Sequence, residues 1–209
     1  DFTVPVHSGG SVTCLRDECL HGNYGTEVIR KLMYLGTDMD EPLVKGRTPA
    51  CIVASLHKRN MFYGGKDDYC QKAAEFFSKD SMEYTDNSGT TAMHQAARNN
   101  HSEMLEVMIG KGADVNITED SPAEAGNTPL HTACIYGSAE AAKVLKEHGA
   151  DDTLQNVNGE TPAHFAVMKK KFGGDLKVEE RAALLKQLNC LDTARNDGKT
   201  PLMLLQYID

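Results

Sequence analysis

Apolar side chains recur along the chain in clusters that suit one face of a short helix. In the best-defined cluster, Met104 and Met108 lie one helical turn apart, with further apolar residues between them. The cluster is followed by Gly112, a residue suited to the left-handed conformation that ends many helices. Gly149 and Asn189 occupy the equivalent places after two later clusters. The hydrophobic pattern therefore predicts amphipathic helices separated by tight turns.

Threonine followed by proline marks the expected starts of several of these helices. The threonine hydroxyl can accept hydrogen bonds from free backbone N–H groups of the first turn, and proline at the first helical position gives up no needed donor. The pair occurs at Thr48–Pro49, Thr128–Pro129, Thr161–Pro162 and Thr200–Pro201. Glycines that follow turn-forming residues, such as Gly159 after Asn158, predict hairpin loops ahead of these starts.

The same order of features repeats along the chain. Residues 89–116 read GTTAMHQAARNNHSEMLEVMIGKGADVN, residues 126–151 read GNTPLHTACIYGSAEAAKVLKEHGAD, and weaker copies begin near residues 11, 46, 159 and 198. These strings resemble the ankyrin repeat, whose period is 33 residues and whose pattern includes T-P-L-H-x-A. The resemblance implies an all-α fold with short hairpin loops, an α-solenoid of stacked helix-turn-helix repeats that share one continuous core.

We expect a single ankyrin-repeat domain over residues 1–209, with five complete repeats and a partial sixth. The repeats are placed at about residues 10–44, 45–85, 86–120, 121–155, 156–193 and 194–209. The last copy contains only its first helix, which would leave the apolar residues 202–205 uncovered. This predicts that the natural chain continues, or that another element packs there.

Three histidines, His94, His131 and His164, recur in phase with the repeat. Histidine is a common metal ligand, but these three fall in different layers of the expected stack, so we do not expect them to meet at one ion. The resemblance instead implies a structural role, in which each histidine bonds the turn of a neighbouring repeat. No metal site is expected.

Composition and charge exclude several classes of function. The 22 Lys and Arg against 30 Asp and Glu give a net charge of −8, which would repel a phosphate backbone, so no nucleic-acid binding is expected. No apolar run approaches the roughly 18 residues of a membrane helix, so no membrane insertion is expected. Nucleophile, phosphate-loop and metalloprotease motifs do not appear in the sequence. We therefore expect neither an enzyme nor a cofactor.

The six cysteines are scattered without close pairs. In a chain of this size they are typical of reduced, buried thiols in a cytosolic protein, so a cytoplasmic or nuclear location is expected. Cys14 and Cys19 could instead pair or react, although Cys19 holds a position that the repeat usually fills with a small buried residue.

The resemblance implies binding of another protein through the concave face that the first helices and hairpin tips form. The positions it makes exposed on two first helices are Arg98, Asn99, Ile135 and Tyr136. Arg and Tyr are residue types that dominate interface energies. Tip residues expected to extend the surface are Asp86, Asn87, Ser88, Glu119, Asp120, Val157 and Asn158. The expected function is non-catalytic protein recognition or scaffolding, by a monomer or by part of a larger chain.

Two stretches lengthen the repeat, by about ten residues between Thr48 and Thr91 and by about six between Thr161 and Thr200. Both insertions combine basic and aromatic residues, and their candidate contact residues are Lys58, Arg59, Phe62, Tyr63, Lys169, Lys170, Lys171 and Phe172. One interpretation is a basic rim that contacts a partner. The other is a pair of tolerated surface loops, since long insertions cost little entropy.

A different class of function stays open beside simple recognition. The chain could be the regulatory or targeting segment of a larger enzyme or channel whose active part lies outside these residues. The fold alone does not choose between the two classes.

Overall fold

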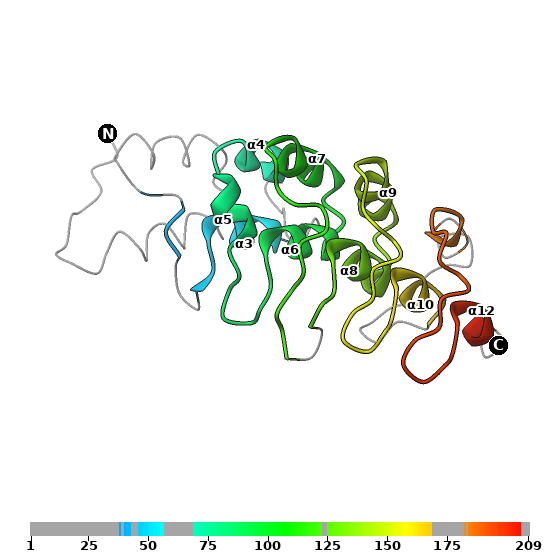
Figure 1. The fold of residues 1–209 in the computed structure, drawn as a ribbon. Coiled ribbons are helices and arrows are strands. Elements are labelled where there is room, and N and C mark those ends of the chain that lie inside the picture. Colours follow the sequence, from blue (N-terminus) through cyan, green and yellow to red (C-terminus); the bar gives the residue numbers. More distant parts are fainter. Residues whose placement is uncertain are drawn as a thin grey trace, which may run out of the picture.

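The computed structural model describes residues 38, 40–42, 46–56, 69–122, 125–168, 182 and 184–205, and this part of the chain contains helices and loops but no strand. The inner helices are α3 (Pro49–Ala54), α6 (Ala92–Arg98), α8 (Pro129–Tyr136), α10 (Pro162–Val167) and α12 (Pro201–Leu205). The outer helices are α4 (Tyr69–Ala74), α7 (Ser102–Gly110) and α9 (Ala139–Glu147), and the short α5 (Lys79–Glu83) lies against α3. Figure 1 shows the inner and outer helices as two parallel rows.

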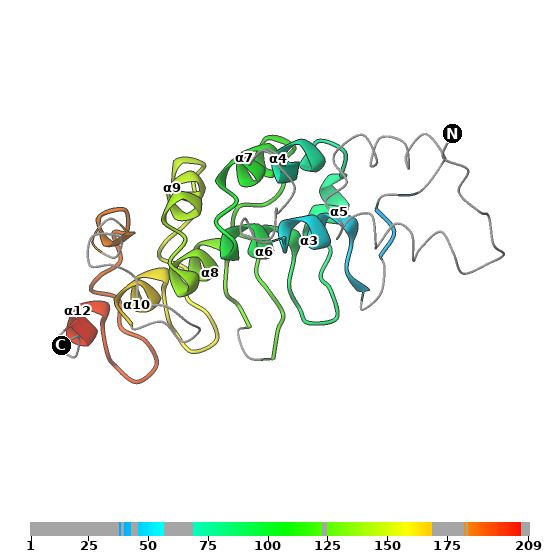
Figure 2. The same cartoon turned by 180° about the vertical axis from the view of Figure 1, so that it is seen from behind.

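The helices stack along one direction. Helix α6 packs between α3 and α8, helix α10 packs between α8 and α12, and α7 packs between α4 and α9. Loops project from the inner row, on the side away from the outer row (Figures 1 and 2). We call these loops the second finger (residues 84–91), third finger (116–122 and 125–128), fourth finger (153–161) and fifth finger (193–200). The surface of the inner helices and fingers is called the concave face. This arrangement confirms the predicted all-α solenoid.

The starts of the inner helices follow the Thr–Pro signal. The Thr48 hydroxyl accepts a hydrogen bond from the backbone N–H of Cys51 at 3.3 Å, and the Thr200 hydroxyl accepts one from Met203 at 3.3 Å. These contacts satisfy N–H groups that a helix start otherwise leaves free. At Thr128 the same contact is a marginal 3.5 Å, and a histidine ring takes over much of the capping there, as described below.

The core between the two rows combines small buried side chains such as alanine with larger ones such as leucine and methionine. On α6, Ala96 and Ala97 are completely buried, and on α7 so are Leu105 and Met108. Small side chains let neighbouring inner helices approach closely, and the larger ones fill the space between the rows. Four free cysteines also lie in this core, at Cys51, Cys70, Cys134 and Cys190. Their burial is as predicted; Cys14 and Cys19 lie outside the described residues.

The turns that follow the helices confirm part of the glycine prediction. Gly112 and Gly149 adopt the expected left-handed conformation, with φ of 88° and 86°. The prediction for Asn189 is wrong, since Asn100 is the one non-glycine residue with positive φ in the described part of the chain. The backbone N–H of Asn189 instead donates to a carboxylate oxygen of Asp152 at 2.6 Å, so the chain is held by the preceding repeat and needs no left-handed turn.

Helix α12 carries the apolar residues that the sequence leaves uncovered. Leu202 and Met203 are 43% and 50% exposed, whereas Leu204 and Leu205 are half-buried. Part of this segment therefore packs against α10, with which α12 is in contact. That another part of a longer chain, or another element, covers Leu202 and Met203 stays a prediction. The expected repeat boundaries also stay a prediction.

Candidate functional site

The concave face is held together by the three in-phase histidines. The backbone N–H of Thr128 donates to Nδ1 of His131 at 3.1 Å, and that of Thr161 donates to Nδ1 of His164 at 3.0 Å. A ring nitrogen that accepts such a bond carries no proton, so the other nitrogen of the neutral imidazole is the donor. Nε2 of His131 accordingly donates to the carbonyl of Glu160 at 3.0 Å. Each of these rings thus joins a helix start to the next finger.

His94 and His164 make the same link to the next finger. Nε2 of His94 lies 3.0 Å from the carbonyl oxygen of Asn127, and Nε2 of His164 lies 3.1 Å from that of Lys199. Burial lowers the pKa of His94 and of His131 to about 4, and it also lowers the pKa of His164. The rings are therefore neutral near pH 7, as this hydrogen-bond pattern requires. The structural role implied by the resemblance is confirmed.

Backbone hydrogen bonds join each finger to the next. The N–H of Asp120 donates to the carbonyl of Gly89 at 2.9 Å, and the N–H of Asn196 donates to the carbonyl of Asn158 at 3.1 Å. Gly89 also has a φ of 81° and lies so close to the backbone of Asp120 that a Cβ atom would overlap it. The fingers therefore form a continuous, tightly spaced row that positions the residues at their tips.

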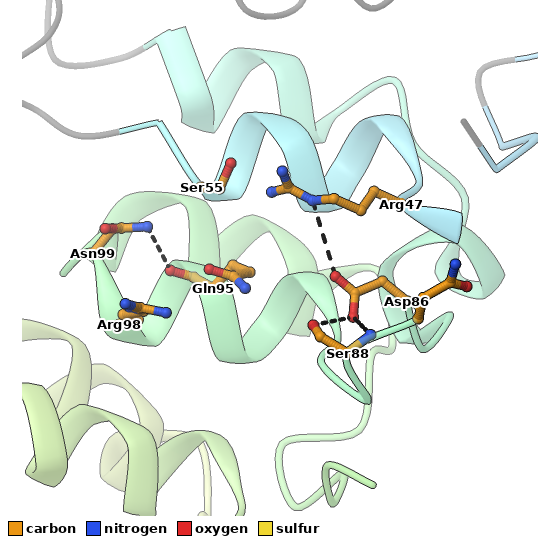
Figure 3. Close-up of a pocket in the computed structure, with 8 residues that line it drawn as sticks. Arg47, Ser55, Asp86, Ser88, Gln95, Arg98 and Asn99 are labelled. Atoms are coloured by element: carbon orange, nitrogen blue, oxygen red, sulfur yellow. Dashed lines mark hydrogen bonds and ion pairs between the residues drawn. The ribbon is translucent and has the colours of Figure 1, made fainter. Parts of the chain in front are cut away.

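A hollow of about 580 Å³ lies on the concave face between α3, α6 and the second finger. Figure 3 shows its lining side chains, which converge from these three elements. The lining residues all have polar or charged side chains and are Arg47, Ser55, Asp86, Asn87, Ser88, Gln95, Arg98 and Asn99. Such a concave polar surface suits a hydrogen-bonding or charged ligand group better than an apolar one.

The only carboxylate in the lining, that of Asp86, is used by its own finger. One of its oxygens accepts hydrogen bonds from the N–H of Ser88 at 2.9 Å, the hydroxyl of Ser88 at 2.5 Å and the N–H of Thr90 at 3.1 Å. Its other oxygen lies 3.9 Å from Nε of Arg47 (Figure 3). Asp86 thus shapes the second finger and balances the charge of Arg47.

Arg98 also lines the hollow, but it contacts an aromatic ring and not a carboxylate of the described residues. Its guanidinium carbon lies 4.5 Å from the centre of the Tyr136 ring, a cation–π contact that joins α6 to α8. The Arg98 side chain is exposed, whereas Tyr136 is half-buried. The stack holds the guanidinium in one place at the surface, which lowers the entropy cost of using it in recognition.

The structure divides the predicted contact residues of the helices and finger tips. Arg98, Asn87, Asp120 and Asn158 are exposed, and Asn99 and Tyr136 are half-buried.

The expectation of exposure is wrong for Ile135, Asp86 and Glu119, which are at most 7% exposed. Helix α8 is covered on both sides by α6 and α10, which buries Ile135. Asp86 turns inward to its finger, and Glu119 lies where the backbone of the third finger pairs with Asn127.

The candidate residues of the two insertions lie outside the described residues, so the basic rim stays a prediction. These residues are Lys58, Arg59, Phe62, Tyr63, Lys169, Lys170, Lys171 and Phe172. The described residues begin with three acidic side chains, those of Asp38, Asp40 and Glu41. Of these, Asp38 and Glu41 are exposed, and Asp40 accepts a hydrogen bond from the N–H of Ser78 at 3.1 Å.

Sequence reasoning missed three residues that line the hollow: Arg47, Ser55 and Gln95. A signal for Gln95 was present, because it lies three positions before Arg98 and so shares its helical face. Arg47 occupies the finger position directly before the capping threonine, where the other copies have Thr90, Asn127, Glu160 and Lys199. The side chain at this position varies freely because the backbone carbonyl makes the histidine bond, so the repeat pattern alone does not mark it.

None of the helices in the described residues is both long and apolar enough to cross a membrane. No group of three or more His, Cys, Asp or Glu side chains in this part of the chain is arranged to hold a metal ion.

Comparisons with known proteins match this architecture. Residues 18–119 match a family model described as "Ankyrin repeats (3 copies)", and residues 120–166 match one described as "Ankyrin repeats (many copies)". The chain is 35% identical over 116 residues to protein phosphatase 1 regulatory subunit 12A of Rattus norvegicus, covering 56% of this chain and 10% of that protein. It is 29% identical over 144 residues to SH3 and multiple ankyrin repeat domains protein 2 of Homo sapiens, covering 69% of this chain and 7% of that protein.

The chain thus spans a tenth or less of the length of these relatives. Repeats of this kind generally mediate contacts between proteins and are typically non-catalytic. The two family matches adjoin each other and together run from residue 18 to residue 166, across the described elements from α3 to α10. The chain belongs to the ankyrin-repeat family.

Proposed function

We propose that this chain is a non-catalytic recognition module that binds a segment of another protein along its concave face and finger tips. The observation that carries the proposal is the Arg98–Tyr136 pair beside the hollow. Arg and Tyr are enriched among the residues that contribute most to binding energy. Here the Arg98 guanidinium lies over the Tyr136 ring, next to a polar hollow that both an inner helix and a finger tip line.

The surroundings of the pair support the same surface. Asn87 and Asn158 lie exposed at the tips of the second and fourth fingers, and Val157 beside Asn158 is 64% exposed. Backbone hydrogen bonds between fingers hold these tips in register with the inner helices. A partner segment running along the stack would therefore meet a largely preformed surface, which favours affinity.

Affinity capture from a native lysate tests this proposal. The wild-type chain is compared with an Arg98→Ala/Tyr136→Ala variant, which removes the pair and leaves the buried core untouched. A Lys143→Ala variant is the matched control, because Lys143 is an exposed cation on the outer helix α9. We expect the double variant to lose captured proteins that the control retains. An unchanged set of captured proteins in the double variant would contradict the concave-face assignment.

A second candidate is a regulatory role within a larger protein. One observation favours it: a relative named as a regulatory subunit of protein phosphatase 1 matches this chain over a tenth of its own length. The recognition module would then place a larger protein, or an enzyme bound to it, next to the captured partner. The size of the endogenous protein, measured with an antibody against residues 126–151, separates the two roles. A product near 22.8 kDa, the mass of this chain alone, would exclude the larger protein.

We also propose a location inside the cell, in the cytoplasm or the nucleus. Four described cysteines are free thiols buried in the core, which is the usual state in a reducing compartment. Subcellular fractionation of the endogenous protein tests this, and recovery from the medium or the secretory pathway would contradict it.

A further inference from the structure

We infer that the hollow beside α6 receives the carboxylate of an acidic side chain, presented by an extended segment of a partner protein and held by Arg98. The inference rests on the proposed function, since it assigns a chemical class of partner to the same surface. Its basis is the charge balance of the hollow, the geometry of Arg98 and the hydrogen-bonding groups beside it.

The charges that line the hollow do not balance. Arg47 and Arg98 bring two guanidinium groups, and Asp86 brings one carboxylate. That carboxylate faces Arg47 and accepts three hydrogen bonds from its own finger, so it is committed on both oxygens. No ion pair forms between Arg98 and a carboxylate of the described residues. One positive charge is therefore left over, in a chain whose net charge is −8.

The placement of the Arg98 guanidinium beside Tyr136 favours a planar acidic group, such as a carboxylate, as its ligand. A guanidinium group that stacks on an aromatic ring uses its face, and its N–H donors point outward along its edge. The guanidinium carbon of Arg98 lies over the Tyr136 ring, 4.5 Å from its centre, and none of the guanidinium N–H groups donates to a described residue. The edge of a guanidinium matches a carboxylate through two parallel hydrogen bonds, which are both strong and directional.

Gln95 adds a neutral donor on the same side. It lies three positions before Arg98 on α6, so both side chains project from one helical face into the hollow (Figure 3). Its side-chain amide makes no hydrogen bond to a described residue, whereas the amide of Asn99 is occupied by the carbonyls of Ala54 and Gln95. A carboxylate bound to Arg98 could thus accept a further bond from Gln95.

A carboxylate fits this charge balance better than a phosphate. A phosphorylated side chain carries about −1.5 to −2 charges at pH 7, whereas the hollow leaves one positive charge unbalanced. Phosphorylated motifs are also commonly recognised by clusters of Arg, whereas this hollow leaves one guanidinium unbalanced. Nucleic acid is disfavoured further by the acidic character of the whole chain.

Peptides selected by the intact 209-residue chain from a random dodecapeptide display library test the inference. We expect the selected sequences to share an Asp or Glu. A synthetic peptide of this set should bind the wild type at least tenfold more tightly than its Glu→Gln version. That preference should fall below twofold in Arg98→Gln and stay unchanged in Lys143→Gln, the matched charge change on α9. Arg98→Lys, which keeps the charge and loses the paired N–H geometry, should fall between them.

The outcomes separate this inference from the proposed function. Selected peptides that lack a common acid but lose affinity in Tyr136→Ala would overturn the carboxylate and leave the concave face standing. Peptides indifferent to both Arg98 and Tyr136 would overturn both proposals. A phosphoserine version that binds tenfold more tightly than the Glu version would overturn the carboxylate in favour of a phosphorylated partner, and selection of no peptide would also count against it. Thermal unfolding followed by circular dichroism checks that each variant is folded.

Discussion

Nε2 of His131 lies 3.0 Å from the carbonyl oxygen of Glu160, which belongs to the following finger. Because Nδ1 of the same ring accepts the N–H of Thr128, one neutral imidazole connects a helix start with the next repeat. The same link joins His94 to Asn127 and His164 to Lys199. The order of the stack, and with it the shape of the concave face, therefore depends on these rings staying uncharged.

Mild acid should destabilise the fold through these histidines. The pKa of His94 and of His131 is lowered from 6.5 to about 4 by burial. Below pH 6.5 the unfolded chain binds protons that the folded chain does not, so stability is lost as pH falls from 6.5 to about 4. The slope approaches about 1.4 kcal/mol per pH unit for each such histidine. Urea unfolding at pH 7.5, 6.0 and 5.0 measures this loss.

A His131→Gln variant isolates one ring from the carboxylates that titrate near the same range. At pH 7.5 the variant should be less stable than the wild type by about 1–3 kcal/mol, since it disturbs buried hydrogen bonds. The difference should shrink at pH 5.0, because the variant no longer has this proton to exclude. Stability curves that run parallel over the whole range would show that His131 does not carry the effect.

A methyl group at Gly89 should weaken the contact between the second and third fingers. Gly89 and Gly112 both have positive φ, 81° and 88°, but only at Gly89 would a Cβ atom overlap the neighbouring backbone, at Asp120 and Ser121. We expect Gly112→Ala to cost about 1–2 kcal/mol, the penalty for a left-handed alanine. Gly89→Ala should cost clearly more. Equal losses in chemical denaturation would show that the fingers are not closely packed there.

Short-range signals in the sequence predicted much of the fold. The Thr–Pro starts, the in-phase histidines and the glycines after helices are local signals with a fixed physical cause, and the structure follows them at Thr48, His131 and Gly112. The repeat pattern also located the concave face through Arg98 and Tyr136. Where the conformation depends on a distant partner the prediction failed, as at Asn189, whose N–H is bound by Asp152 of the preceding repeat.

The electrostatics of the site was the harder part to predict. Asp86 looks like an exposed acidic tip in the sequence, but its hydrogen bonds to Ser88 and Thr90 turn it inward. Arg47, which neutralises it, lies 39 positions earlier, and no periodic pattern links the two residues. Only the folded arrangement shows that Arg47 is balanced and that Arg98 has no carboxylate among the described residues.

Removing Arg195 should raise the pKa of Asp197 in the fifth finger. Two nitrogens of Arg195 donate to the two carboxylate oxygens of Asp197, each at 2.7 Å, and these bonds hold the pKa of Asp197 at about 2. In Arg195→Gln the pKa should move toward the ordinary 3.8. NMR titration of the carboxyl carbon measures it. Lys199→Gln should raise the pKa of Asp197 less, because Nζ of Lys199 lies 3.9 Å from the Asp197 carboxylate. A larger rise in Lys199→Gln than in Arg195→Gln would contradict this assignment.

The buried thiols should be unreactive in the native state. Burial raises the pKa of Cys51 to about 11 and raises that of Cys134 further, so almost no thiolate is present at pH 8 at either position. Maleimide labelling followed by peptide mass spectrometry should leave both unmodified in buffer and modify both in urea. Rapid labelling of Cys134 in buffer would mean that the packing between the fourth and fifth repeats opens readily.

Hydrogen exchange on the captured complex tests the central claim most directly, because it locates the bound surface without altering it. Amide exchange is compared between the free chain and the chain bound to its captured partner or to a selected peptide. We predict slower exchange at residues 86–90, 95–101 and 136–138, which surround the hollow and the Arg98–Tyr136 pair. Residues 102–110 and 139–147 of the outer helices α7 and α9 should be unchanged. Slower exchange confined to these outer helices would contradict recognition through the concave face.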